Sequence, residues 1–304
     1  MAKFWETLGE KLADRWLQVS VPALVFWYGV ALAWLADKGT SEAGRQAHKF
    51  TEQPTALQVV IVLSILIAIA ASGVLVQALS IPVQRLMEGY WPPFLSPIRR
   101  RAVARIQRRN ETEQQAYYQY YARMQSSPNA ETALHLARLE RRRKYMPARY
   151  SALMPTRFGN ALKVAEERAT TLYGLVPEVL WPHLRQLLPE SLLQDFEESQ
   201  KKLKGTVERI VWALLFTGFG YFAWWPPVIG ILIVVFSYLV LPSRAYVLAD
   251  LAAVSWDLHR VELYKKLRWP VPENPGDEIS RGARLTSYIA RGWDENSPTF
   301  TEPV

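Results

Sequence analysis

Long apolar runs alternate with polar segments along this chain, and the apolar runs have the length of membrane-spanning helices. They cover residues 16–36, 56–81 and 207–247, and Pro226-Pro227 divides the last of them in two. A helix needs about 20 apolar residues to cross the hydrocarbon core of a bilayer. The pattern therefore predicts an all-α membrane protein with four spans, paired as one hairpin in residues 16–91 and another in residues 208–247.

The fourth span is shorter than the others. Only fourteen residues lie between Pro227 and Pro242. Continuing the helix to Val247 restores the length, because Arg244 can extend its charged end to the membrane interface, and it makes Pro242 a predicted kink. The alternative is a shallow hairpin that enters the membrane and returns on the same side.

One face of the second span carries small and polar side chains. Ser64, Ala68 and Ser72 follow one another at four-residue spacing, and Gln77 comes near the end of the run. Small residues at this spacing let helices approach closely in lipid, and the amide of Gln77 needs a partner in protein or water. We expect this face to pack on other helices or to line a pore, together with Pro242 of the fourth span.

Residues 92–207 form the only long polar block, and we expect them to form a helical cytoplasmic domain between spans two and three. The block lacks the alternation of apolar and polar residues that strands show. Proline and glycine residues divide it into segments that predict separate helices. These helices are expected near 97–126, 129–145, 159–172, 176–187 and 190–208, and the last is expected to run into the third span.

The remaining segments lie at the ends and between the spans. Residues 1–15 are predicted to form an amphipathic helix on the membrane surface, and residues 37–55 a polar loop without apolar periodicity. Pro226-Pro227 predicts a tight turn between the third and fourth spans. From Pro270 on, several prolines predict a flexible tail, residues 270–304, with one short helix near 278–292.

A cytoplasmic amphipathic helix is predicted for residues 248–269, after the fourth span. Its apolar residues step by four and three positions, as in the seam of a coiled coil, but only for two heptads. They are Val247, Leu251, Val254, Leu258 and Val261. Two interpretations stay open: a seam between subunits of a homo-oligomer, or a helix that packs on its own cytoplasmic domain.

Positive charge is concentrated between the second and third spans. The chain has a net charge of +8, and residues 85–204 contain 21 basic and 12 acidic side chains. The first polar helix opens with Arg99, Arg100, Arg101, Arg105, Arg108 and Arg109. Basic loops stay on the cytoplasmic side, so we expect both termini in the cytoplasm of a bacterial inner membrane. These arginines are expected to bind anionic lipid headgroups, and nucleic acid is a weaker alternative.

Catalytic chemistry is poorly represented in the sequence. There is no cysteine, and the four histidines, His48, His135, His183 and His259, are scattered over different segments. None of them belongs to a motif of two histidines or of the H-E-x-x-H type, and no glycine-rich loop follows a predicted strand. We therefore expect no metal, no cofactor and no enzymatic activity.

The most distinctive motif lies in the middle of the polar block. It comprises Pro155, Thr156, Arg157, Gly159 and Asn160, then Tyr173-Gly174-Leu175, then Trp181 and Pro182 in a stretch that ends in Leu187-Leu188-Pro189. Thr156 or Asn160 can cap the start of a helix, and Trp181 beside Pro182 predicts a buried corner. We expect a structural core motif, and the alternative is a ligand site built on Arg157 and Asn160.

This motif resembles a pattern of bacterial membrane proteins, PTRxGN…YGL…WPxLxxLLP, and the resemblance implies a family but no activity. The order of spans is similar to that of bestrophin-type anion channels in layout only, because no bestrophin motif aligns with these residues. We expect an oligomeric channel or pore that is regulated through its cytoplasmic domain. The alternative is a membrane anchor that recruits a soluble partner or anionic lipid through residues 92–207.

Overall fold

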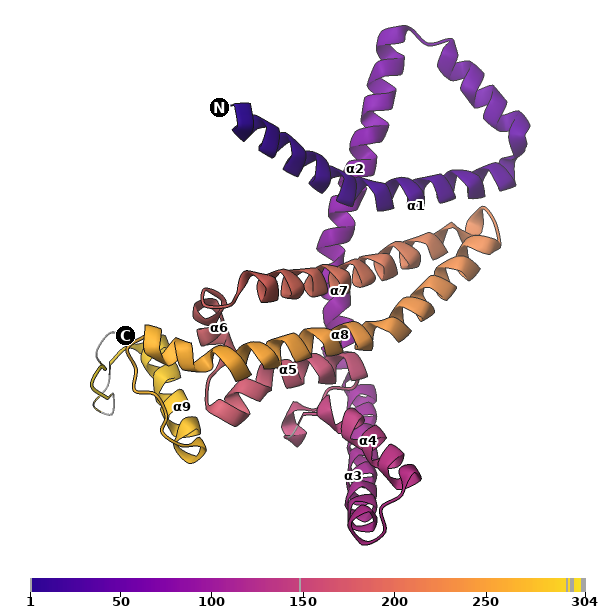
Figure 1. Cartoon of the computed structure of the whole chain (residues 1–304). Helices are drawn as coiled ribbons and strands as arrows, with labels where there is room; N and C mark the ends of the chain where they lie inside the picture. Colours follow the sequence, from indigo (N-terminus) through magenta and orange to yellow (C-terminus); the bar gives the residue numbers. More distant parts are fainter. Residues whose placement is uncertain (1, 148, 294, 296–297, 302–304) are drawn as a thin grey trace. The chain divides into compact units, whose positions relative to one another are not determined.

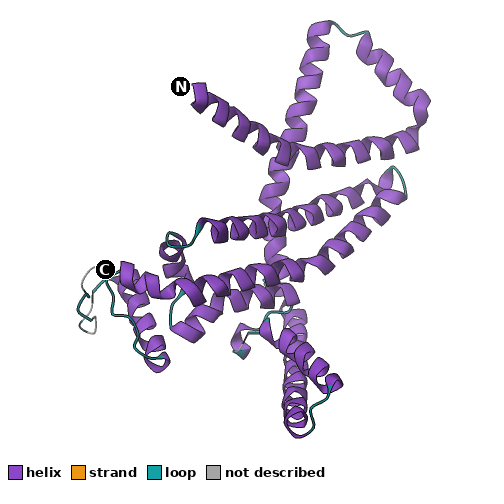
Figure 2. Ribbon diagram, viewed as in Figure 1, coloured by secondary structure: helices purple, strands orange, loops and turns teal. Residues whose placement is uncertain are grey.

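The chain folds into helices joined by short connections (Figure 2). The computed structural model describes residues 2–147, 149–293, 295 and 298–301, with side chains from residue 21 on, and no strand occurs among them. The α-helices are labelled in Figure 1. In chain order the elements are α1 Ala2–Thr51, α2 Thr55–Glu88, η1 Pro93–Leu95, α3 Ser96–Ser126, α4 Ala130–Lys144, η2 Tyr150–Ala152, α5 Arg157–Tyr173, α6 Pro177–Arg185, α7 Glu190–Thr217, η3 Gly218–Tyr221, α8 Trp225–Lys266 and α9 Pro275–Arg291. The predicted all-α fold class is confirmed for the described residues.

The helices form two compact units, and each unit is built from two separate stretches of chain. The first unit combines residues 1–84 with 204–240, and the second combines 85–203 with 241–304. Helices α2, α7 and α8 therefore contribute residues to both units. Each unit has buried side chains of its own.

In the first unit, α1 packs on α7 through aromatic rings. The ring centre of Phe26 lies 4.7 Å from that of Trp212 and 6.0 Å from that of Phe216. Such pairs contribute about 0.5–1.5 kcal/mol beyond the burial of area. Helix α1 also contacts α2, since Nε1 of Trp27 donates a 3.1 Å hydrogen bond to Oγ of Ser72.

The connection predicted at 37–55 is not a loop throughout. Helix α1 starts at Ala2 and continues to Thr51, and it is interrupted at Gly39, whose φ is 77° and ψ is 166°. Glycine adopts a positive φ without steric cost. Beyond Gly39, Glu42 pairs with Arg45 one turn further on, and such local pairs stabilise a helix. They create no apolar periodicity, and the prediction of a loop was wrong for that reason.

The connection between α7 and α8 precedes the two prolines. Helix α7 ends at Thr217, η3 occupies Gly218–Tyr221, and α8 begins at Trp225. Pro226 and Pro227 therefore stand in the first turn of α8, where a missing backbone N–H costs least. The predicted turn at Pro226-Pro227 is wrong because proline fits the start of a helix as well as it fits a turn.

Two helices in the described chain are long and apolar enough to cross a membrane. One lies within Thr55–Ser126, in the part that forms α2, and the other is α8. Large aliphatic side chains are exposed along both, among them Ile67 in α2 and Leu232 in α8. The core helix of a soluble protein would bury such side chains.

The other two predicted spans, 16–36 and 207–225, are not among these two helices. The first begins at residues whose side chains the structure does not describe. The second coincides with the end of α7, which starts in polar sequence at Glu190 and ends at Thr217. The predicted continuity of the last polar helix with this apolar segment is confirmed, and the four-span arrangement stays a prediction.

The core of the second unit is formed by α5, α6, the later part of α8 and α9. Its largest fully buried side chains are Trp256, Tyr264 and Trp269. Leu285 of α9 is also fully buried in this core. The short helix predicted near 278–292 is confirmed as α9, Pro275–Arg291. The prediction that the tail around it is flexible is wrong for this helix, because α9 covers a core whose position only the folded chain defines.

Two glycines let α9 lie against α5 without intervening side chains. A Cβ at Gly282 would lie 1.9 Å from the carbonyl oxygen of Tyr173. A Cβ at Gly174 would lie 2.0 Å from the carbonyl oxygen of Ile279, and Gly174 has a φ of 69° at the end of α5. Only glycine meets both requirements at position 174.

Helix α8 buries the face opposite to its predicted coiled-coil seam. The buried residues of this part are Leu241, Ala245, Ala249, Ala252, Ser255, Trp256, Leu263 and Tyr264. Of the five seam residues, Val247, Val254, Leu258 and Val261 are exposed, and Leu251 is partly buried. Packing on the chain's own unit therefore occurs mainly through a different face, and four of the five seam residues stay exposed within the described chain. Pro242 lies inside α8, which continues as one helix to Lys266.

Candidate functional site

The motif at 155–160 fixes the start of α5 to the end of α2. Oγ1 of Thr156 accepts a 2.9 Å hydrogen bond from the N–H of Gly159 and donates one of 2.8 Å to the carbonyl oxygen of Met87. The last carbonyl groups of a helix lack partners within that helix. One hydroxyl group therefore serves two helix ends, and losing such a cap costs about 0.5–2 kcal/mol.

Gly159 and Asn160 complete this junction. A Cβ at Gly159 would lie 1.8 Å from the carbonyl oxygen of Glu88, so a larger residue does not fit. Oδ1 of Asn160 accepts a 2.8 Å hydrogen bond from the N–H of Met154, and its Nδ2 donates one of 3.0 Å to the carbonyl oxygen of the same residue. The contacts of these two residues are thus structural.

The other apolar residues of the motif lie outside this junction or at its edge. Pro155 packs over Gly89, where a Cβ would lie 2.4 Å from the proline ring. Trp181 is partly buried, and Pro182 is exposed in the middle of α6. The predicted buried corner at Trp181-Pro182 is therefore wrong. The buried residues of α6 are Leu180 and Leu184, which stand four positions apart on one face.

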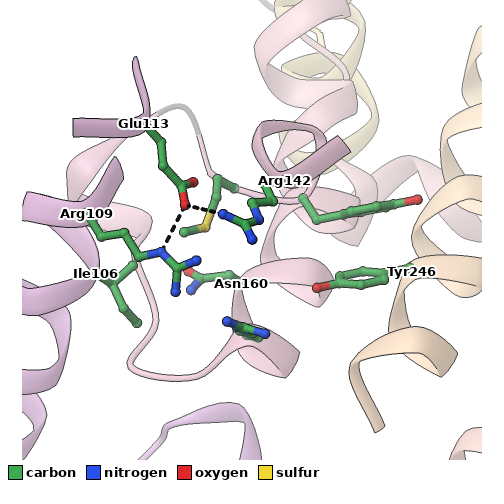
Figure 3. Close-up of a pocket in the computed structure, with 9 residues that line it drawn as sticks. Ile106, Arg109, Glu113, Arg142, Asn160 and Tyr246 are labelled. Carbon is green, nitrogen blue, oxygen red and sulfur yellow. Dashed lines mark hydrogen bonds and ion pairs between the residues drawn. The ribbon is translucent and has the colours of Figure 1, made fainter. Parts of the chain in front are cut away.

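Arg157, the remaining residue of the motif, lines a cavity between α3, α4, α5 and α8 (Figure 3). The cavity has a volume of about 140 Å³. Its lining consists of Ile106, Arg109, Glu113, Arg142, Tyr145, Met146, Arg157, Asn160 and Tyr246. Three guanidinium groups and one carboxylate therefore surround one small space, which we name the arginine cavity.

Glu113 holds two of the three arginines. Its Oε1 accepts a 2.9 Å hydrogen bond from Nε of Arg109 and one of 3.1 Å from Nη1 of Arg142, both drawn in Figure 3. Arg157 is exposed and has no ion-pair partner among the described residues. The groups lining the arginine cavity thus carry two positive charges that no lining carboxylate balances.

The aromatic wall of the arginine cavity is attached to α8. The rings of Tyr145 and Tyr246 stack with 3.9 Å between their centres. Oη of Tyr145 donates a 2.8 Å hydrogen bond to Asp250, which also pairs with Nζ of Lys144 at 2.8 Å. Burial raises the pKa of Tyr145, and the carboxylate of Asp250 raises it further. Because Lys144 balances Asp250, this carboxylate does not neutralise the arginines.

Most of the predicted arginine block lies on the surface. Arg99, Arg100, Arg101, Arg105 and Arg108 are exposed on α3, and none of them forms an ion pair within the described chain. Arg101, Arg105 and Arg108 stand at positions i, i+4 and i+7 and share one side of the helix. We name the five residues the arginine face. Arg109 is separate from it because its guanidinium group lines the arginine cavity.

The small-residue face of α2 contacts another helix of the same chain at Ser72. Ser72 accepts the hydrogen bond from Trp27 and donates one of 2.6 Å to the carbonyl oxygen of Ile69. Gln77 is partly buried, whereas Ser64 and Ala68 are exposed. The hydroxyl group of Ser72 is therefore satisfied without a pore, and only the earlier part of the face is open.

A second polar network, which the sequence analysis missed, joins α5, α8 and α9. Asp257 accepts hydrogen bonds of 2.6 Å from Tyr173 and 3.1 Å from Arg168. Arg260 pairs with Glu278 at 2.6 Å and lies 4.2 Å from the ring centre of Tyr173. Burial raises the pKa of Tyr173, and Asp257 adds to the increase. The charges balance one another, so the network holds three helices together and leaves no net charge for a ligand.

Metal-binding chemistry is not evident in the part of the chain that the structure describes. No group of three or more histidine, aspartate or glutamate residues there is arranged to hold an ion. The expectations of no cofactor and no enzymatic activity stay predictions, because nothing in the structure tests them.

Comparison of the chain with protein-family models, with curated proteins and with solved structures found no match. The resemblance of the PTRFGN motif to bacterial membrane proteins therefore stays a prediction.

Proposed function

We propose that this chain is a membrane protein whose arginine face binds anionic lipid headgroups at the membrane surface. The supporting observation is the five guanidinium groups that are exposed on α3 and unpaired within the described chain. Each basic group close to an anionic leaflet contributes about 1 kcal/mol at low salt. Arg101, Arg105 and Arg108, which share one side of α3, together supply roughly 3 kcal/mol of attraction to an acidic membrane.

The membrane assignment is supported by the two long apolar helices. Helix α2 has no charged residue before Arg85, and α8 has none before Arg244. We propose that the predicted spans 16–36 and 207–225 complete four crossings. In a bacterial inner membrane the basic second unit and both termini then lie in the cytoplasm, where basic segments are retained.

Lipid binding tests this role with the full chain in mild detergent. The wild type should bind a fluorescent phosphatidylglycerol more tightly than the matching phosphatidylcholine, and added salt should reduce the difference. Replacing all five residues of the arginine face by glutamine should abolish the preference. Equal binding of the two lipids by the wild type would contradict the proposal.

A matched variant controls for total charge. Arg138, Arg141, Lys265, Lys266 and Arg284 are also exposed and form no ion pair in the described chain, but they lie on three other helical segments. Replacing these five residues by glutamine should leave the lipid preference intact. If both variants lose it equally, net charge rather than the arginine face is responsible. An acidic soluble partner is the other ligand suited to this face, and it would compete with the lipid.

A second candidate function is a homo-oligomeric channel, and the exposed seam on α8 favours it. Val247, Val254, Leu258 and Val261 stand at coiled-coil spacing without cover in the described chain, a pattern by which copies of one helix pack together. The Leu258→Glu variant should then reduce the assembly to monomers, and Ser64→Phe should alter single-channel steps in planar bilayers. A monomeric wild type with silent recordings would contradict this candidate.

A further inference from the structure

We propose that the arginine cavity binds the phosphate group of a small phosphomonoester. Its lining residues come from α3, α4, α5 and α8 of the second unit, so a folded chain is needed to assemble it. The cavity is separate from the arginine face. Its ligand chemistry therefore stands or falls independently of the proposed role at the membrane surface.

The charge of the cavity matches a phosphate dianion. Arg109, Arg142 and Arg157 contribute three positive charges, and Glu113 removes one. A phosphomonoester carries a charge of about −1.5 to −2 at pH 7. It would therefore neutralise the lining almost completely, whereas a carboxylate would leave one guanidinium uncompensated.

Two of the three arginines are already held in position when the cavity is empty. Glu113 fixes Arg109 and Arg142 through one carboxylate oxygen, which lowers the entropy that binding would otherwise cost. A guanidinium group has five N–H donors, so each of these two arginines keeps most of its donors for a ligand. Arg157 has no ion pair in the described chain and stands at the first position of α5, where the helix dipole favours an anion.

The size of the cavity limits the rest of the ligand. A volume of about 140 Å³ is well below the roughly 300–1,000 Å³ of pockets for drug-sized molecules. A phosphate group with a short carbon chain fits such a space. Ile106, Met146 and the ring of Tyr246 provide apolar lining for the carbon chain.

Two sources present this chemistry: a soluble phosphomonoester and the headgroup of phosphatidic acid. Glycerol 3-phosphate serves as the probe for the first, and phosphatidic acid in nanodiscs of phosphatidylcholine serves for the second. Binding of glycerol 3-phosphate to the full chain in mild detergent is measured by calorimetry. Binding that occurs only with phosphatidic acid would identify the lipid as the source.

The decisive variant is Arg157→Gln, because Arg157 is exposed and its removal breaks no ion pair in the described chain. It should weaken binding of the phosphomonoester at least tenfold, and Arg157→Lys should restore part of the affinity. The control is Arg141→Gln, next to Arg142 in sequence but outside the cavity lining, and it should change the affinity less than twofold. Binding should also weaken between pH 7.5 and pH 5, since the second phosphate pKa is about 6.

The proposal is overturned if neither probe binds the wild type, or if Arg157→Gln binds as tightly as the wild type. Binding of either probe that is lost in Arg157→Gln and kept in Arg141→Gln supports it. If the chain binds glycerol 3-phosphate but shows no preference for phosphatidylglycerol, the proposed role of the arginine face is contradicted. The proposal for the arginine cavity then still stands.

Discussion

The two parts of helix α8 differ in the side chains that they expose. In the first unit it exposes aliphatic side chains on several sides, and Leu239 is 71% exposed. From Leu241, which is fully buried, it belongs to the second unit and buries one face only. A helix that is apolar all round suits lipid, whereas a helix that buries one face against a core suits the surface of a folded unit. The first half of α8 therefore fits the proposed membrane crossing, and the second half fits its place on the core of the second unit.

The contacts within the two units differ in the same way. In the first unit, rings such as Phe26 and Trp212 pack at the surface of apolar helices, and a single hydrogen bond joins Trp27 to Ser72. The second unit has buried tryptophans, glycine contacts and a balanced network around Asp257. Packing is the main attraction available to helices in lipid, while a unit in water also gains from burying apolar area.

The largest difference between the units should be in the stability that is lost when one tryptophan is replaced in each. Trp256 is 1% exposed in the second unit, and Trp224 is 79% exposed in the first. Trp256→Ala should lower the free energy of unfolding by about 3–5 kcal/mol, and Trp224→Ala by no more than about 0.5 kcal/mol. Thermal unfolding in detergent compares the two. Equal losses would show that the second unit has no separate core.

Two glycine substitutions compare the units through smaller changes in stability. Gly174→Ala places a Cβ 2.0 Å from a backbone carbonyl oxygen at a positive φ, which costs roughly 1–2 kcal/mol for the backbone conformation alone. Gly205 lies inside α7, and a Cβ there meets nothing within 4 Å. Gly205→Ala should therefore stabilise the chain by about 0.5–1 kcal/mol. Stabilisation by both substitutions would mean that α9 does not lie against α5.

The alkaline stability of the second unit should depend on Tyr264. This tyrosine is fully buried, its Oη has no hydrogen-bond partner among the described residues, and burial raises its pKa. Above about pH 10 the unfolded chain releases the tyrosine proton before the folded chain does. The unfolded state then binds fewer protons, so the free energy of unfolding falls as the pH rises, by up to about 1.4 kcal/mol per pH unit.

Replacing Tyr264 by phenylalanine should flatten this decline, and it should change the stability at pH 7 only slightly because no hydrogen bond is lost. Unfolding temperatures between pH 8 and pH 11 provide the measurement. Tyr118→Phe is the control, since Tyr118 is exposed on α3. An identical alkaline decline in the wild type and in Tyr264→Phe would rule out this residue as the cause.

Helix limits in the second unit were predictable because local chemistry sets them. Pro97 stands in the first turn of α3, and Asn129 caps α4 by accepting a 2.7 Å hydrogen bond from the N–H of Thr132. Thr156 does the same for α5. The helix after Gly39 was missed because its pairs, such as Glu42 with Arg45, leave no apolar pattern. Periodicity finds helices that bury a face, and this one does not.

The arginine cavity was predictable only in part. The motif drew attention to Arg157 and Asn160, but Asn160 is committed to the backbone of Met154. The partners of Arg157 come from helices far apart in sequence, from Ile106 to Tyr246. These residues come together only through the packing of α3, α4 and α8, and their spacing in the sequence does not predict it.

Solvent exposure of two matched positions tests the contrast between the units most directly. The chain has no cysteine, so Ile67→Cys in α2 and Leu258→Cys in α8 each introduce a single thiol. The native side chains are 68% and 67% exposed, respectively. A water-soluble maleimide reacts with the thiolate, which needs water around it. In opened membranes, where both surfaces are accessible, Leu258→Cys should react quickly and Ile67→Cys only after denaturing detergent is added. Equal reaction rates at the two positions before detergent would contradict the assignment of lipid to the first unit and water to the second.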